Sequence, residues 1–151
     1  MKPTVFNQQL PLVIGCDHAG FEYKEAIKTW LAANGWNVED KGTYSADSTD
    51  YPDYAHPVAS MVAEGSAATG ILICGSGNGV CMTANKHAGI RAALCWNEEL
   101  ASLARQHNNA NIICIPARFV SLELAQNMAD TFLSTPFEGG RHERRVEKMA
   151  L

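Results

Sequence analysis

The sequence lacks the features that mark several large classes of protein. No apolar run is long enough to span a bilayer, and the first eleven residues are too polar for the apolar core of a signal peptide. Basic residues are not in excess, because 12 lysines and arginines stand against 16 acidic residues, for a net charge of −4. A broad basic face for nucleic acid or a membrane surface is therefore not expected. These absences favour a cytoplasmic protein whose partner is a small molecule.

The five cysteines show neither a disulfide pattern nor a metal-binding pattern. Their number is odd, none is in C-x-x-C spacing, and Cys16, Cys74, Cys95 and Cys114 lie in or at the end of apolar runs. No H-x-x-x-H motif and no cluster of carboxylates accompanies them. Reduced thiols and no bound metal are expected.

The apolar pattern predicts a single α/β domain over residues 1–151, with residues 1–11 as an N-terminal lead. A chain of 151 residues with 46% hydrophobic content is long enough to bury a proper core. Strict alternation of strands and helices predicts a doubly wound, five-stranded parallel sheet with helices on both faces, Rossmann-like and flavodoxin-like. Strands are expected at 12–16, 37–40, 70–74, 91–95 and 111–115, and helices at about 21–35, 55–63, 80–86, 97–106, 125–133 and 141–149.

The stretch from Gly70 to Gly79, G-I-L-I-C-G-S-G-N-G, combines a buried strand with a glycine-rich loop. Its backbone N–H groups are expected to point at an anion, and the positive environment favours the thiolate of Cys74 at the end of the strand. Three phosphate-binding motifs fail on spacing. Val80 replaces the arginine of a thiolate phosphatase loop, no G-K-[ST] follows the glycines, and their even spacing departs from G-x-G-x-x-G. The alternative for Cys74 is a small buried hydrophobe.

Polar residues follow three of the predicted strands. Asp17 and His18 follow the first, Cys74 and Ser76 the third, and Arg118 the fifth. Ligands of parallel α/β sheets bind beyond the carboxyl ends of the strands, so these side chains are expected to face one crevice. The alternative for Asp17 and His18 is a helix cap.

Three further residues have both a functional and a structural interpretation. His107 lies at the end of a predicted helix, where it could favour the helix dipole. Arg141 and Arg145 are four residues apart and could grip a phosphate monoester from one helix face. Set among glutamates, they could equally form a solvated surface.

Six motifs closely resemble those of the type B ribose-5-phosphate isomerase family. They cover nearly the whole chain, from Leu12 to Val146, in the order that the family shows. The motifs are G-C-D-H-A-G (15–20), D-Y-P-D-Y-A (50–55), I-C-G-S-G-N-G (73–79), A-N-K-H-A-G-I-R-A (84–92), R-Q-H-N (105–108) and E-G-G-R-H-E-R-R-V (138–146). The resemblance implies a cofactor-free isomerase of the pentose phosphate pathway, which interconverts ribose 5-phosphate and ribulose 5-phosphate as a homodimer with shared active sites.

The resemblance also implies a role for individual residues. Cys74 matches the base that moves a proton between C1 and C2, and His107 matches the acid/base that opens the sugar ring. Some members use a glutamate at the position of Val80, so this chain resembles the branch with a thiol base. The other matched positions bind substrate, with the arginines on the phosphate: Asp17, His18, Gly75, Ser76, Gly77, Asn78, Gly79, Asn108, Arg118, Arg141 and Arg145.

Two other functions remain open from the sequence. A six-carbon relative would isomerise allose 6-phosphate or galactose 6-phosphate, and the length of the pocket would decide between the substrates. A flavodoxin-like module would bind a phosphorylated ligand without turning it over, but such a module has no use for a thiolate or a ring-opening acid. One departure from the family is local, because Pro116 and Ala117 precede Arg118 where a glycine is expected.

Overall fold

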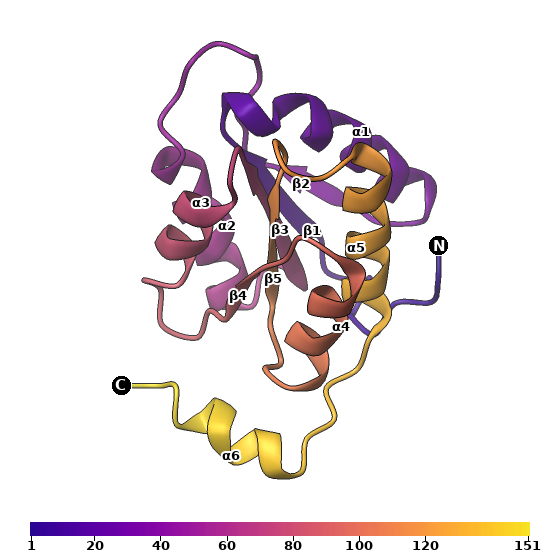
Figure 1. Cartoon of the computed structure of the whole chain (residues 1–151), viewed down its shortest axis with the longest axis vertical. Coiled ribbons are helices and arrows are strands. Elements are labelled where there is room, and N and C mark those ends of the chain that lie inside the picture. Colours follow the sequence, from indigo (N-terminus) through magenta and orange to yellow (C-terminus); the bar gives the residue numbers. More distant parts are fainter.

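The computed structural model describes all residues 1–151 and contains the predicted parallel sheet (Figure 1). All five strands pair in parallel in the order β2-β1-β3-β5-β4. Relative to the flavodoxin-like order 2-1-3-4-5, the last two strands have exchanged places. The strands are β1 (Leu12–Cys16), β2 (Val38–Asp40), β3 (Thr69–Cys74), β4 (Ala92–Leu94) and β5 (Ile112–Pro116).

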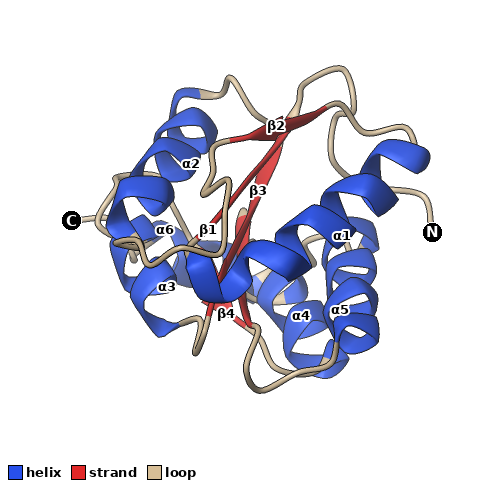
Figure 2. Cartoon of the chain, turned by 90° about the horizontal axis from the view of Figure 1, so that it is seen from above, coloured by secondary structure: helices blue, strands red, loops and turns tan.

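Helices cover both faces of the sheet, as predicted (Figure 2). One face packs against α1, α4 and α5, and the other against α2 and α3. No helix has the length and hydropathy needed to cross a bilayer. The helices are α1 (Phe21–Ala33), α2 (Pro52–Glu64), α3 (Asn78–Ala84), α4 (Glu98–Gln106), α5 (Leu122–Ser134) and α6 (Arg141–Glu147), and a single 3₁₀ turn, η1 (His18–Gly20), precedes α1.

Alternate residues of the central strands enter different cores. In β3, Ile71 and Ile73 join the larger cluster under α1, α4 and α5, while Leu72 joins the smaller one under α2 and α3. All three residues are fully buried, which explains why the run is apolar without alternation. Val58 of α2 packs tightly on the sheet, because a Cβ at Gly15 or Gly70 would lie 2.9 Å from one of its methyl groups.

The N-terminal lead lies against the body of the domain. Val5 N–H and the Thr4 hydroxyl both donate to the carbonyl of Leu133 at the end of α5. The Phe6 ring stacks on Phe132 at 5.8 Å, and the guanidinium of Arg105 lies 4.6 Å from the Phe6 ring centre. The lead thus packs on α5 and α4.

Because all five strands run in the same direction, the sheet has a carboxyl edge, where every strand ends, and an amino edge, where every strand begins. The carboxyl ends of all five strands lie at one edge, which is at the top of Figure 1. The order of strands reverses between β1 and β3, because β2 lies on one side of β1 and β3 on the other. The crevice expected at such a switch point therefore lies between the ends of β1 and β3.

Candidate active site

A pocket of about 430 Å³ opens at this switch point. The structure brings together there the polar residues that follow β1, β3 and β5, as the sequence predicts, although their chemical roles remain predictions. The lining residues are Asp17, His18, Ala19, Tyr51, Cys74, Gly75, Ser76, Gly79, Arg118 and Phe119.

The turn after β1 presents one carboxylate oxygen and one imidazole nitrogen for a ligand. Asp17 Oδ1 accepts from the N–H groups of Ala19 and Gly20 at 3.0 and 3.2 Å, so the carboxylate does cap η1. Its Oδ2 has no partner within the chain and is available as an acceptor. His18 Nδ1 accepts from the backbone N–H of Thr49 at 3.2 Å. In the neutral ring this contact places the proton on Nε2, which can donate to a ligand oxygen.

The loop after β3 surrounds Cys74 with unpaired N–H groups. Cys74 is 4% exposed and lines the pocket. The N–H groups of Gly75, Ser76, Gly77 and Gly79 donate no hydrogen bond within the chain, whereas Asn78 N–H donates to the Ser76 hydroxyl at 3.3 Å. Several unpaired donors beside one thiol suit the stabilisation of a developing oxyanion.

Two glycines give this loop its shape. Gly77 has a φ of +75°, and a Cβ there would lie 2.4 Å from a methyl group of Leu94. Gly79 faces the Tyr51 ring, which an added Cβ would meet at 2.6 Å. Asn78 begins α3 and, with Ser76, lines a neighbouring pocket of about 440 Å³.

Arg118 reaches the pocket despite Pro116 and Ala117. Ala117 N–H donates to the carbonyl of Cys74 at 2.9 Å, and Arg118 N–H donates to that of Gly75 at 3.0 Å. The guanidinium lies over Gly75, where a Cβ would approach Nη1 to 3.2 Å. The turn after β5 is thus bonded to the loop after β3, and the Arg118 cation lines the same pocket as the thiol.

Tyr51 and Phe119 line the pocket but were not among the predicted site residues. Tyr51 lies just before α2, and its ring covers Gly79. The motif at 50–55 contained it, but nothing in that motif shows that a long loop brings it to the end of β3. Phe119 is 75% exposed, and its position directly after Arg118 was the available signal.

The other predicted residues lie at the opposite edge of the sheet. Because α4 runs back from the carboxyl end of β4 to the amino end of β5, His107 and Asn108 at its end lie at the amino edge. The chain then carries α6 to the same place, where Glu138 N–H donates to the carbonyl of Gln106 at 3.1 Å (Figure 1). Within one chain, the thiol and the predicted ring-opening histidine therefore lie on different edges.

At the amino edge, His107 stacks face to face on His142 of α6. The ring centres are 4.2 Å apart and the planes differ by 11°. His142 Nε2 lies 3.5 Å from Glu138 Oε2. Desolvation, and next the neighbouring His107, lower the pKa of His142. Ligand atoms of His107, Glu138 and His142 lie within 4.8 Å of one another. A metal ion lies in the plane of each imidazole that binds it, so two parallel stacked rings cannot share one ion without turning.

Buried Arg105 fixes the turn that carries His107. Its guanidinium donates to the Thr135 carbonyl at 3.1 Å, to Asn109 Oδ1 at 3.1 Å and to the Ala110 carbonyl. Burial lowers the pKa of Arg105 to about 10, so it stays charged at neutral pH. The exposed Arg141 and Arg145, by contrast, have no carboxylate within 4.0 Å, because the ion pairs of the chain involve other cations.

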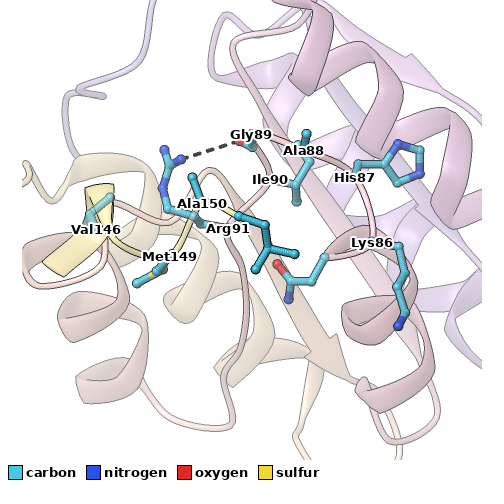
Figure 3. Close-up of a pocket in the computed structure, with 11 residues that line it drawn as sticks. Lys86, His87, Ala88, Gly89, Ile90, Arg91, Val146, Met149 and Ala150 are labelled. Atoms are coloured by element: carbon cyan, nitrogen blue, oxygen red, sulfur yellow. Dashed lines mark hydrogen bonds between the residues drawn. The ribbon is translucent and has the colours of Figure 1, made fainter.

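A separate cavity lies at the amino edge and is lined by none of the predicted site residues. It has a volume of about 340 Å³ and lies between residues 85–91 and the C-terminal residues 146–151 (Figure 3). Arg91 on its wall is tied to the backbone, since its Nε donates to the Asn109 carbonyl at 2.9 Å. The cavity shows that the C-terminal residues follow the amino edge past α6.

Comparison with known proteins gives one consistent family. The model of the ribose/galactose isomerase family matches residues 12–149. The chain is 49% identical over 136 residues to ribose-5-phosphate isomerase B of Escherichia coli. This match covers 90% of this chain and 91% of that protein. The crystal structure of a ribose 5-phosphate isomerase from Thermotoga maritima superposes with a TM-score of 0.91 at 52% identity, over 93% of this chain and 97% of that one.

A third relative has a ligand. The structure of ribose-5-phosphate isomerase B from Mycoplasma genitalium with bound ribulose 5-phosphate has a TM-score of 0.91 at 45% identity, over 95% of both chains. The match of the family model begins at Leu12, where the N-terminal lead ends. Matches of this length and identity show that the chain belongs to the ribose/galactose isomerase family.

Proposed function

We propose that this protein is an aldose–ketose isomerase that interconverts ribose 5-phosphate and ribulose 5-phosphate. The observation that carries the proposal is the buried Cys74 thiol in a pocket with unpaired loop N–H groups and the cation of Arg118. Proton transfer next to a carbonyl needs a base and donors aimed at the developing oxyanion. Relatives named as ribose-5-phosphate isomerases, one with bound ribulose 5-phosphate, support the choice of substrate.

In the proposed mechanism, His107 opens the furanose and Cys74 moves the proton. His107 transfers the proton between the ring oxygen and the anomeric hydroxyl, which frees the aldehyde. The Cys74 thiolate then takes the C2 proton, giving an enediolate whose oxygen accepts from the loop N–H groups. The O2 hydroxyl proton passes to O1, and return of the carbon-bound proton from Cys74 to C1 then gives the ketose. Asp17 Oδ2 and His18 Nε2 contact the sugar oxygens from the turn after β1.

The mechanism requires two copies of the chain. His107, Asn108, Arg141 and Arg145 lie at the amino edge, whereas Cys74 lies at the carboxyl edge. In a two-fold dimer, the amino edge of each subunit meets the carboxyl edge of the other, so that two complete sites form. The exposed aromatic rings of Trp96 and Phe119 beside the loop after β3 suit burial against a partner. We therefore infer a homodimer with shared active sites.

The substrate is tested by a direct comparison of three sugars. Purified protein is incubated with ribose 5-phosphate, allose 6-phosphate and galactose 6-phosphate, and ketose formation is measured. The proposal predicts the highest kcat/KM for ribose 5-phosphate. A higher kcat/KM for either six-carbon sugar would identify that sugar as the substrate in place of ribose 5-phosphate. Binding of all three without ketose formation would make the protein a binding module.

Arg141→Ala and Arg145→Ala are expected to raise KM for ribose 5-phosphate more than they lower kcat. Both guanidinium groups are exposed without a carboxylate partner, as is required of groups that bind a phosphate. A grip on the non-reacting phosphate holds substrate and transition state alike, so its loss appears mainly in KM. Steady-state kinetics measures both constants, with Arg144→Ala on the same helix as the control. Unchanged KM and kcat in both variants would assign the arginines to a solvated surface.

A further inference from the structure

His142 stands out on α6 because it is the one buried residue of that helix. It is 8% exposed, whereas Arg141, Glu143 and Arg145 around it are exposed. A mostly charged helix of seven residues has little intrinsic stability in isolation, so its orientation depends on tertiary contacts. The buried face of α6 is essentially one imidazole ring.

That ring packs on the predicted ring-opening group. The rings of His142 and His107 are stacked at 4.2 Å with an interplanar angle of 11°. Glu138, in the segment between α5 and α6, contacts both elements. Its backbone N–H donates to the carbonyl of Gln106 at the end of α4, and its carboxylate lies 3.5 Å from His142 Nε2. The end of α4, residue 138 and α6 thus meet at a single ring.

The connection between α5 and α6 makes this contact important. Gly139 and Gly140 precede α6, and both have positive φ values, of 68° and 56°. A hinge of two glycines does not fix the rotation of the helix that follows it. His142 follows Arg141 directly, so the ring that docks on His107 also sets the direction of the Arg141 and Arg145 side chains.

The charged groups around His142 favour its neutral form. Four charged or titratable groups act on it: His107 from α4, Arg141 and Arg145 from α6, and Glu138 from the preceding segment. The cations outnumber the one carboxylate, and the pKa of His142 is lowered. A neutral His142 ring can stack on His107 without charge repulsion between the two rings.

We propose that His142 is a positioning residue, whose stacked ring holds His107 and the Arg141–Arg145 pair as one rigid unit. The inference rests on the proposed function, in which His107 opens the ring and the arginines bind phosphate. It adds that phosphate binding and ring opening are coupled through one ring, so that a docked phosphate fixes His107 against the furanose. Misplacement of a catalytic group by about 1 Å can cost about 10²-fold in rate.

The test compares two substitutions that differ in whether a flat ring remains. His142→Ala is expected to lower kcat for ribose 5-phosphate by about 10- to 10²-fold and to raise its KM. His142→Phe keeps a ring of similar shape for stacking and is expected to retain most of the wild-type kcat. At saturating ribulose 5-phosphate, solvent deuterium uptake at C1 needs no ring opening and is expected to survive better in His142→Ala. Thermal unfolding and sedimentation of each variant control for loss of the fold or of the dimer.

A double substitution separates action through His107 from an independent effect. If His142 acts only by positioning His107, the His107→Asn/His142→Ala variant has the same kcat for saturating ribose 5-phosphate as His107→Asn alone. Additive losses would overturn the inference, as would wild-type kinetics of His142→Ala beside an impaired His107→Asn. Undiminished kcat of His107→Asn itself would instead overturn the ring-opening assignment in the proposed function, and this inference with it.

Discussion

Cys74→Ala is expected to lower kcat for ribose 5-phosphate by about 10²- to 10⁴-fold, the usual effect of losing a positioned acid/base, with little change in KM. The thiol is 4% exposed and shares its pocket with Asp17, His18 and Arg118, which still hold the substrate in the variant. Removing a base acts on the transition state rather than on the bound ground state. The side chain is small, so its truncation leaves the β3 backbone and the loop N–H groups in place. Steady-state kinetics in both directions measures the loss.

Cys81→Ala provides the matched thiol control for this substitution. Cys81 is half-buried in α3, and its Sγ contacts the Ala92 carbonyl at 3.4 Å, outside the pocket. This variant is expected to retain a rate close to that of the wild type. Near-wild-type turnover of Cys74→Ala would show that no base is needed there and that Cys74 is a core residue.

His107→Asn is expected to slow the conversion of ribose 5-phosphate by about 10²- to 10⁴-fold, while the proton shift on ribulose 5-phosphate survives much better. Ribose 5-phosphate is mostly a closed furanose, which must open before its C2 proton becomes acidic. Ribulose 5-phosphate has its O5 blocked by phosphate and arrives open. The thiolate and the loop after β3 then suffice for exchange at C1.

The measurement pairs two rates in each protein. One is the initial rate of ribose 5-phosphate isomerisation, and the other is solvent deuterium uptake into ribulose 5-phosphate. The variant can still release the open aldehyde, which closes in solution, so the contrast respects the overall equilibrium. Equal losses in both rates would show that His107 acts in the enediolate step, or only maintains the structure of the site, and would remove the ring-opening assignment.

Much of the fold follows from local patterns in the sequence. All five strands were predicted near their observed positions, because β-branched runs such as Ile112–Pro116 have few other stable arrangements. Their order across the sheet could not be read in the same way, since no strand encodes which neighbour it pairs with. In the structure, Ala92–Leu94 is short and partly exposed, as suits an edge strand, whereas β5 is buried throughout.

The positions of the site residues were likewise predictable only in part. The gathering of Asp17, His18, Cys74, Ser76 and Arg118 follows from chain direction alone, since each follows a parallel strand. The same reasoning applied to α4 puts His107 at the far edge, because a helix that follows a parallel strand runs back. Tyr51 could not be foreseen, since its place depends on the path of the long loop after β2.

The central claim is that each active site combines the Cys74 edge of one subunit with the His107 edge of another, and mixed dimers test it most directly. Cys74→Ala and His107→Asn chains are unfolded, mixed in equal amounts and refolded together, and kcat for ribose 5-phosphate is compared with that of each variant refolded alone. Random pairing makes about half of the dimers hybrids, each with one intact and one doubly defective site, so about a quarter of the wild-type activity should return. If Cys74 and His107 acted within one chain, no hybrid would contain an intact site. The mixture would then show only the mean of the two residual activities, which would contradict the shared site.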